Sequence, residues 1–331
     1  MRLLIVLVAA LVLAAPAGGR STADPPAELF VFPFDTTPGA TAETDVDLSL
    51  PGSSSLAIAT VTEYAPAGYT IALASPPRTA IGSASVFFDG RLDPVSAGLF
   101  TADPAPFATD AQAQSCAPGL HAGVWTAALD TAPLTVFVDP TAGDESARGA
   151  YRLVYCLPSP GDTRIVDVDL DLQSVLTNAA AAGLATWRAL VTPSSGAAFE
   201  VRSQVALPQT LTLKPSFSTR RNALALTGRL LAAGMPRAQV NVHVAAATRA
   251  DLSDAQDLGV ARTRADGSYS LRKTVARKRT KQRLILIAYV NFYVGDCSDP
   301  PLLPGGCAEQ SIAPPPAQLT TLTIPGERPQ R

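Results

Sequence analysis

Histidine is almost absent from this chain, which has only His121 and His243 among its 331 residues. A serine or cysteine nucleophile needs a base beside it, and no Gly-x-Ser-x-Gly segment accompanies either histidine. The count alone excludes zinc sites built from several histidines. Both histidines are therefore expected to be structural. His243 is expected to point to solvent, because the alternating Val242 and Val244 would face the core.

Motifs that bind phosphate are also missing. The chain has no P-loop and no Gly-x-Gly-x-x-Gly after a strand, so no nucleotide and no cofactor is expected. Aromatic residues are only 6 % of the chain, and Trp125 and Trp187 lie in strand-like runs that predict core positions. Few aromatic platforms for sugars are therefore left. A secreted carbohydrate-active enzyme that uses carboxylates of the first half stays as an alternative, because such enzymes need only two.

The chain has one long apolar run, and it lies at the very beginning. Residues 3–15 are uncharged and apolar, and small residues follow at Ala15-Pro16-Ala17. The run is shorter than the ~20 residues that span a bilayer, so residues 1–17 are predicted to be a cleaved signal peptide. No second such run exists, so the mature chain is expected to lack a transmembrane segment. We expect a secreted or cell-envelope-associated protein.

Four cysteines are present, an even number that suits an oxidising compartment. Two close Cys-x-x-Cys pairs, as in a zinc site, do not occur. Four cysteines allow ~3 pairings. The sequence positions favour one disulfide between Cys116 and Cys156 and a second between Cys297 and Cys307.

Turn-forming residues are abundant, with 29 Pro and 23 Gly, and they divide the chain into short runs of alternating or β-branched residues. Sustained helical periodicity is almost absent. The pattern predicts an all-β protein made of two tandem β-sandwich domains. The predicted strands are residues 44–50, 56–64, 69–74, 83–88, 124–129, 134–138, 151–156, 164–173, 185–191, 200–206, 211–214, 239–245 and 284–293.

Two predicted strands carry aspartates at alternate positions. Asp167, Asp169 and Asp171 alternate with apolar residues, and Asp45 and Asp47 repeat the pattern. Side chains at alternate positions lie ~6.6 Å apart, too far for one calcium ion without loop ligands. We therefore expect these aspartates to form solvated strand faces.

The charge is divided along the chain. Residues 1–204 have a net charge of −11 and residues 205–331 a net charge of +9, by the count of Asp, Glu, Lys and Arg. A new strand also begins after Leu207-Pro208. We predict an acidic β-sandwich domain of unassigned family at residues 24–207. A basic immunoglobulin-like β-sandwich domain is predicted at 208–326 and a tail at 327–331.

The second of these predicted domains contains a recognisable pattern. It comprises Leu226-Thr-Gly-Arg-Leu230, the segment 235–242 with Pro-Arg-Ala-Gln-Val, and Thr263-Arg-Ala-Asp-Gly-Ser-Tyr-Ser-Leu271. This pattern resembles the bacterial immunoglobulin-like and carboxypeptidase-regulatory-like (prealbumin-type) domains. The resemblance implies a β-sandwich that acts as a spacer, stalk or binding module, with no family catalytic residues. The chain departs from it in a basic tract after Leu271 and in the late cysteine pair.

The basic tract is the main candidate for a binding site. Its charges fall between two predicted strands, so they are expected to share one exposed edge. They would either keep that edge soluble or attract an anionic partner. The expected partner is an anionic cell-envelope polymer, a membrane surface or the protein's own acidic domain. Nucleic acid is not expected as a partner, because export makes it less available. A non-catalytic binding or structural protein is the main prediction, and a purely structural spacer is a further alternative. The candidate residues are Arg272, Lys273, Arg277, Lys278, Arg279, Lys281 and Arg283.

Overall fold

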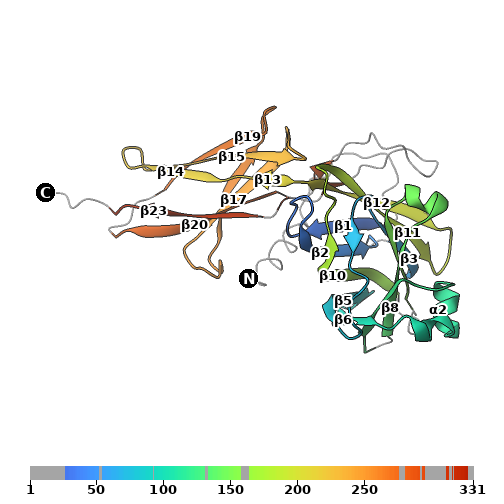
Figure 1. Ribbon diagram of the computed structural model, residues 1–331. Helices are drawn as coiled ribbons and strands as arrows, with labels where there is room; N and C mark the ends of the chain where they lie inside the picture. The colour runs from blue at the N-terminus through green and yellow to red at the C-terminus, as the bar shows by residue number, and fades with distance from the viewer. Residues whose placement is uncertain are drawn as a thin grey trace.

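The computed structural model describes residues 27–326 except 52–53, 92, 131–132, 158–163, 276–279, 291–292, 295–310, 313–314 and 316. The fold is nearly all β, as the sequence predicts. The predicted signal peptide, the tail, Cys297, Cys307, Arg277, Lys278 and Arg279 lie outside the described residues. Figure 1 shows the strands grouped in two bodies arranged end to end.

Each body has its own apolar core. The larger core gathers buried residues from Ala27 to Leu207. The smaller one gathers buried residues from Leu211 to Ile324. We call residues 27–207 the first unit and residues 208–326 the second unit.

The first unit is built on one long sheet. Its strands follow the order β1-β2-β10-β5-β6-β7-β8-β9-β3-β11-β12, with neighbours antiparallel, and β4 adds to β10. The sheet folds over on itself, because β1 also packs beside β12. The strands are β1 Glu28–Pro33, β2 Thr41–Ser49, β3 Ile58–Ala65, β4 Thr70–Ile71, β5 Ala80–Phe88, β6 Val95–Ala102, β7 Gly123–Ala128, β8 Pro133–Pro140, β9 Tyr151–Cys156, β10 Ile165–Thr177, β11 Gly183–Pro193 and β12 Phe199–Leu207.

The core of the first unit follows the alternation of its strands. Val168, Leu170 and Leu172 on β10 are fully buried, as period-2 alternation requires. Trp125 and Trp187 are 1 % and 0 % exposed, so the prediction of core tryptophans is confirmed. Trp187 meets Tyr69 edge to face, with ring centroids 5.5 Å apart.

Short helices lie between the strands of the first unit. They are η1 Ala105–Ala108, α2 Ala111–Cys116 and η2 Gly143–Ala147. The α2 helix begins because the Asp110 carboxylate caps it, accepting a hydrogen bond from the Ala113 N–H at 2.7 Å. This helix is not among the elements that the sequence pattern predicts. It packs on a small outer cluster that includes Phe137 and Val154.

The second unit consists of two sheets, as expected of a β-sandwich. One sheet has the order β13-β15-β14, with β16 and β19 also pairing with β15, and the other has the order β18-β17-β20-β23. Its strands are β13 Gln209–Leu211, β14 Lys214–Ser218, β15 Ala223–Ala232, β16 Met235–Pro236, β17 Asn241–Ala247, β18 Gln256–Arg262, β19 Ser268–Thr274, β20 Gln282–Val290 and β23 Gln318–Ile324.

Two short strands from the later part of the chain add to the first sheet. They are β21 Tyr293–Val294 and β22 Ser311–Ile312. Gln204 on β12 pairs in parallel with Ile312, and β21 pairs with β22. The chain of the second unit therefore returns to the first unit.

The turn between β18 and β19 explains the Asp266-Gly267 segment of the sequence pattern. Gly267 has φ +74°, and a Cβ there would lie 2.5 Å from the Leu230 carbonyl oxygen. Glycine is needed for both the conformation and the close approach. The Tyr269 ring that follows is buried, and its hydroxyl donates to the Thr212 carbonyl at 2.6 Å.

Candidate functional site

The described residues of the basic tract lie at the end of the second unit that is farther from the first (Figure 1). Arg272 and Lys273 are near the end of β19, while Lys281 and Arg283 flank the start of β20. All four side chains are exposed. Since β19 and β20 belong to different sheets, these four residues place positive charge on both sheets at this end.

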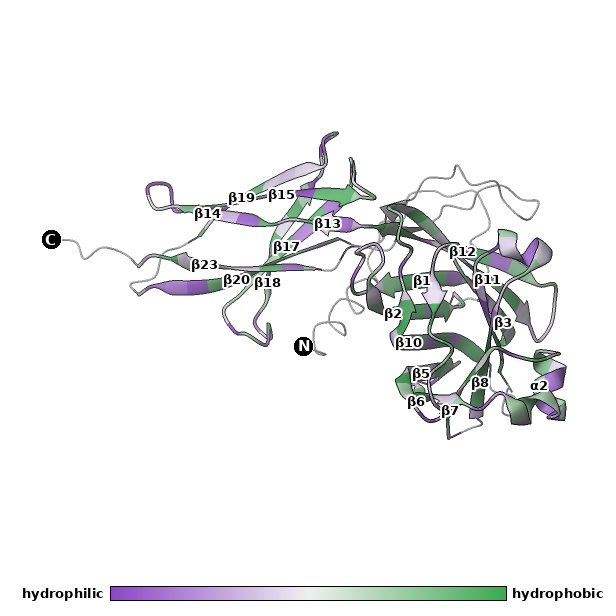
Figure 2. Cartoon of the chain, viewed as in Figure 1, coloured by the Kyte–Doolittle hydropathy of each residue, from purple (hydrophilic) through white to green (hydrophobic). Residues whose placement is uncertain are grey.

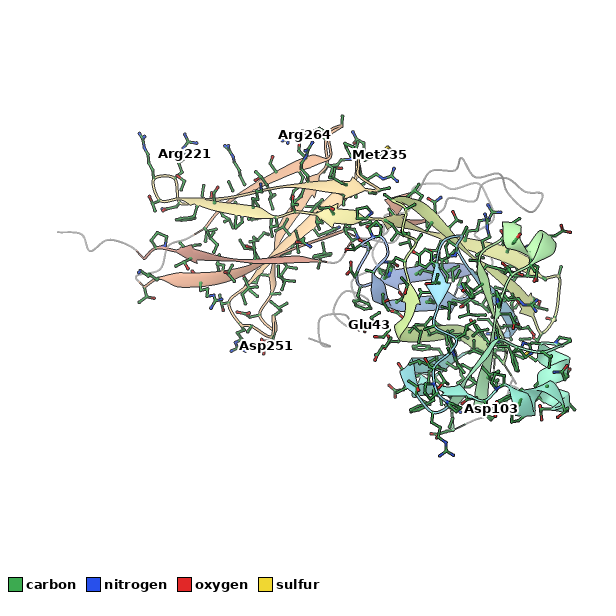
Figure 3. All side chains as sticks on the ribbon, viewed as in Figure 1. Glu43, Asp103, Arg221, Met235, Asp251 and Arg264 are labelled. Atoms are coloured by element: carbon green, nitrogen blue, oxygen red, sulfur yellow. A yellow bond between two sulfur atoms is a disulfide. The ribbon has the colours of Figure 1, made fainter. Side chains whose placement is uncertain are left out.

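Two further arginines lie at the same end. Arg220 and Arg221 are exposed in the turn between β14 and β15. The Val275 N–H donates to the Asn222 carbonyl at 2.9 Å, which holds this turn beside the end of β19. Figure 3 places Arg221 at the far end of the second unit, and Figure 2 shows this turn and the start of β20 as hydrophilic. Two adjacent arginines followed by the turn-forming Asn222 are the sequence feature from which this second group of charges could have been predicted.

We call the six described side chains Arg220, Arg221, Arg272, Lys273, Lys281 and Arg283 the basic end. In the part of the chain that the structure describes, no ion pair neutralises any of them. Figure 3 shows Asp251 at a different side of the unit from Arg221. Among the described residues, then, the positive charge of the basic end is uncompensated.

The described acidic residues of the second unit accept hydrogen bonds from nearby backbone N–H groups. Asp254 accepts from the N–H groups of Thr248 and Arg249 at 3.1 and 3.0 Å. Asp266 accepts from the Ser268 N–H at 3.0 Å, and this hydrogen bonding holds the pKa of its carboxyl below the ordinary value. Asp257 likewise accepts from the Gly259 N–H at 2.9 Å.

In the first unit, the prediction of solvated aspartate faces is wrong. Strands β2 and β10 are neighbours, and the register places Asp47 opposite Asp169 and Asp45 opposite Asp171. One carboxylate oxygen of each aspartate is buried and has no hydrogen-bond partner among the described groups. We call Asp45, Asp47, Asp167, Asp169 and Asp171 the aspartate face.

Aromatic rings beside the aspartates account for the burial. On β1, Phe30 is aligned with Asp47 and Phe32 with Asp45. On the other side, β5 aligns Phe87 with Asp167. All three rings are half-buried. Strands in the middle of a sheet are thus screened from water by their neighbours even on the face away from the core.

Burial and mutual repulsion keep part of the aspartate face protonated. Burial, with a hydrogen bond to Asp169, raises the pKa of Asp45 to about 9. Burial, with the charge of Asp167, raises the pKa of Asp47 to about 8. The proton-sharing contacts run diagonally, Asp45 with Asp169 and Asp47 with Asp167, and in each the β2 carboxyl holds the proton. Asp171 instead accepts from Gln173 at 3.1 Å.

His121 has the structural role that the sequence analysis predicts. Its side chain is 2 % exposed, and Nδ1 lies 3.0 Å from an Asp139 carboxylate oxygen. Nε2 lies 2.9 Å from the Ala117 carbonyl oxygen. Arg152 also pairs with Asp139, at 3.4 Å. The ring thus fastens the α2 segment to β8.

A disulfide lies beside this network. It joins Cys116 at the end of α2 to Cys156 at the end of β9, with the Cα atoms 5.8 Å apart. The predicted pairing of these two cysteines is therefore present. The predicted pairing of Cys297 with Cys307 concerns residues outside those described and stays a prediction.

His243 faces away from the core of the second unit, but it is half-buried rather than fully directed to solvent as predicted. Val242 and Val244 on either side of it are fully buried. The imidazole stacks on Tyr289, with ring centroids 5.2 Å apart. Partial burial lowers the pKa of His243 below its ordinary value.

Glu63 is a buried carboxyl that the sequence analysis does not single out. It points into the core of the first unit from β3 and is 0 % exposed. The Tyr155 hydroxyl donates to Oε1 at 2.7 Å, and Oε2 has no partner among the described groups. Burial raises the pKa of Glu63 to about 7.

A cavity of about 350 Å³ opens between the β3–β4 turn, η2 and the β10–β11 connection. Its lining includes Pro66, Arg148 and Leu184, and no Asp or Glu lines it. The carboxylates of the aspartate face touch across neighbouring strands, whereas a glycosidase separates its two by ~5–9.5 Å. The carbohydrate-active enzyme stays a prediction without support from this cavity.

Within the described ranges, no three Cys, His, Asp or Glu side chains are arranged to hold a metal ion. None of the helices described there has the length and apolar character needed to cross a membrane.

Comparison with known proteins gives little further guidance. No family model matches the chain, and no curated protein matches it. A solved structure, a tetra-tandem repeat in the extending region of a large adhesion protein, is similar at 12 % identity with a TM-score of 0.23. That match covers 91 % of this chain and 74 % of the other. At this TM-score the match does not bear on function.

Proposed function

We propose that this protein is an exported, non-catalytic binding protein that holds an anionic polymer of the cell envelope at the basic end of its second unit. The observation that carries the proposal is the gathering of six exposed cationic side chains at one end, contributed by β14–β15, β19 and β20. Charges on turns of two sheets present a broad surface, which suits an extended polyanion. The resemblance to spacer and binding modules agrees with this role.

The position of the basic end favours an external partner over the protein's own acidic unit. Figure 1 shows the β14–β15 turn and the start of β20 at the end that points away from the first unit. Exposed charges separated by more than about 8–10 Å are largely screened at physiological salt. The first unit of the same molecule is therefore poorly placed to neutralise the basic end.

The test is binding of the mature protein to purified envelope from its producing cells, across a salt titration. A basic side chain near an anionic surface contributes about 1 kcal/mol, so Arg220→Gln with Arg221→Gln should weaken binding on the order of 30-fold at low salt. Wild-type binding should itself weaken as salt is added. The Arg277→Gln, Lys278→Gln, Arg279→Gln variant tests the rest of the predicted tract.

The matched control removes two arginines from the other end of the same unit. Arg262→Gln with Arg264→Gln should bind as the wild type does, since Figure 3 shows Arg264 nearer the first unit than Arg221. The free energy of unfolding of the Arg220/Arg221 variant should differ from that of the wild type by less than about 0.5 kcal/mol, as is usual for exposed surface sites. Absence of binding at low salt, or equal loss in the control, contradicts the proposal and leaves the spacer.

A further inference from the structure

The β1–β2 hairpin lies at the contact between the two units. Thr36, in its turn, is 6 % exposed. The Thr36 hydroxyl accepts from the Gln209 N–H at 2.9 Å and donates to the Gln209 carbonyl at 3.3 Å. Gln209 is the first residue of β13, where the second unit begins. We call this pair of hydrogen bonds the joint.

The same turn is fastened to the first unit. The Asn178 amide donates to the carbonyls of Asp35 and Thr37 at 2.8 and 3.1 Å. The Gly39 N–H donates to the Ala179 carbonyl at 3.1 Å. The joint therefore depends on a turn whose own position is set by the end of β10.

Along the strands, the hairpin is attached to β10 through the aspartate face. Asp45 and Asp47 on β2 meet Asp167, Asp169 and Asp171 on β10. The strands on either side contribute no positive charge, because β5 is uncharged and β1 has only Glu28, whose charge also acts on Asp47. Exposed Glu43 lies further along β2. Without protons, the attachment would place like charges directly opposite each other, which destabilises a strand pair.

We propose that the aspartate face is a proton-controlled clasp, which holds the β1–β2 hairpin on β10 when its carboxyls share protons and loosens the hairpin, and with it the joint, when they are lost. The protonation state of the clasp would therefore control how rigidly the second unit is held against the first. It goes beyond the binding proposed for the basic end and does not depend on it.

The direction of the pH effect follows from the raised pKa values. Asp45 and Asp47 keep their protons in the folded hairpin up to about 9 and about 8, whereas an unfolded strand releases them near 3.8. The folded state therefore binds more protons across this range, and stability of the hairpin falls as the pH rises through it.

The test compares the wild type with Asp45→Asn/Asp47→Asn by amide hydrogen exchange at equal pH. The Asn amide keeps the donor to the β10 carboxylate and cannot ionise. At about pH 9, β2 amides of the wild type should exchange about tenfold faster or more than those of the variant, and the difference should shrink steadily as the pH is lowered towards about 4, where the unfolded strand also holds its protons. The Gln209 amide, which donates to Thr36, should follow the same pattern.

Three controls make the result specific. Glu43→Gln removes one charge from the same strand outside the proton-sharing pairs and should behave as the wild type. Glu63→Gln removes the core carboxyl that titrates in the same range, and the difference made by the two Asn substitutions should persist in that background. Asp167→Asn/Asp169→Asn repeats the experiment from β10 if the first variant folds poorly.

Equal exchange of β2 amides in wild type and both Asn variants at about pH 9 rejects the clasp. If the β2 amides of the wild type exchange faster than those of the variants but the Gln209 amide exchanges equally in all of them, the coupling between the clasp and the joint is rejected.

Discussion

The two units of this protein hold opposite charge, and they hold it in different places. In the first unit much of the acidic charge is withdrawn from water, in the aspartate face, in Glu63 and in Asp139 beneath His121. In the second unit the basic side chains stand exposed at strand ends, and the described acids cap turns. The net charges of −11 and +9 therefore differ in their exposure to water as well as in sign, since much of the first is buried and the second is exposed.

The difference shows that the sign of a unit's charge does not reveal its binding surface. A buried carboxyl contributes to net charge by count, yet burial favours its neutral form. An exposed arginine stays charged and available. The basic end is thus a stronger candidate for binding than any acidic surface of the first unit, although the first unit has the larger count.

The prediction with the largest expected effect tests whether the two cores unfold independently of each other. Trp187→Ala should destabilise the first unit by about 3–5 kcal/mol, because a fully buried indole leaves a cavity. Hydrogen exchange should accelerate in β9, β11 and β12 and remain as in the wild type in β17 and β20. Equal acceleration in both units would mean that they unfold as one body. Leu286→Ala, in the second core, is the converse variant.

A second test concerns the covalent link found in the described part of the first unit. Cys116→Ala with Cys156→Ala should lower the free energy of unfolding of that unit by about 2–4 kcal/mol, because the unfolded chain gains freedom. Denaturant unfolding followed by tryptophan fluorescence reports it directly, since both tryptophans lie in the first unit. Reduction of the wild type should reproduce the loss, and an unchanged midpoint would show that the bond adds no stability.

The smallest expected effect is a gain in stability from removing a buried acid. The pKa of Glu63 is raised to about 7, so the folded protein loses stability as the pH rises from near 4.5 through about 7. Glu63→Gln should therefore be more stable than the wild type at about pH 8.5, on the order of 1–3 kcal/mol, and similar at about pH 4. Thermal unfolding at both pH values measures this. A wild-type protein that is more stable than Glu63→Gln at about pH 8.5 would contradict this prediction.

Much of the fold could be predicted from alternation, because each strand's pattern is local. The Ile165–Thr177 strand shows it well, since its apolar residues enter the core as expected. What the pattern omits is which strands become neighbours. Asp45 and Asp169 are far apart in sequence, so their contact, and the burial that follows, depend on a pairing that no local signal specifies.

The candidate site was predictable in part for the same reason. Arg272, Lys273, Lys281 and Arg283 form one run of sequence, and the structure keeps them at one end. Arg220 and Arg221 join them only because β14–β15 packs beside β19. The α2 helix was missed because six residues are too few for a periodic signal, although Asp110 is a recognisable cap.

The Thr36–Gln209 contact sets an order on assembly. The two residues are separated by 173 positions. The β1–β2 turn therefore cannot form its hydrogen bonds to Gln209 until almost all of the first unit has been synthesised. The joint can form once Gln209 has been synthesised, before most of the second unit exists. The direction in which the second unit leaves the first can therefore be set before the second unit folds.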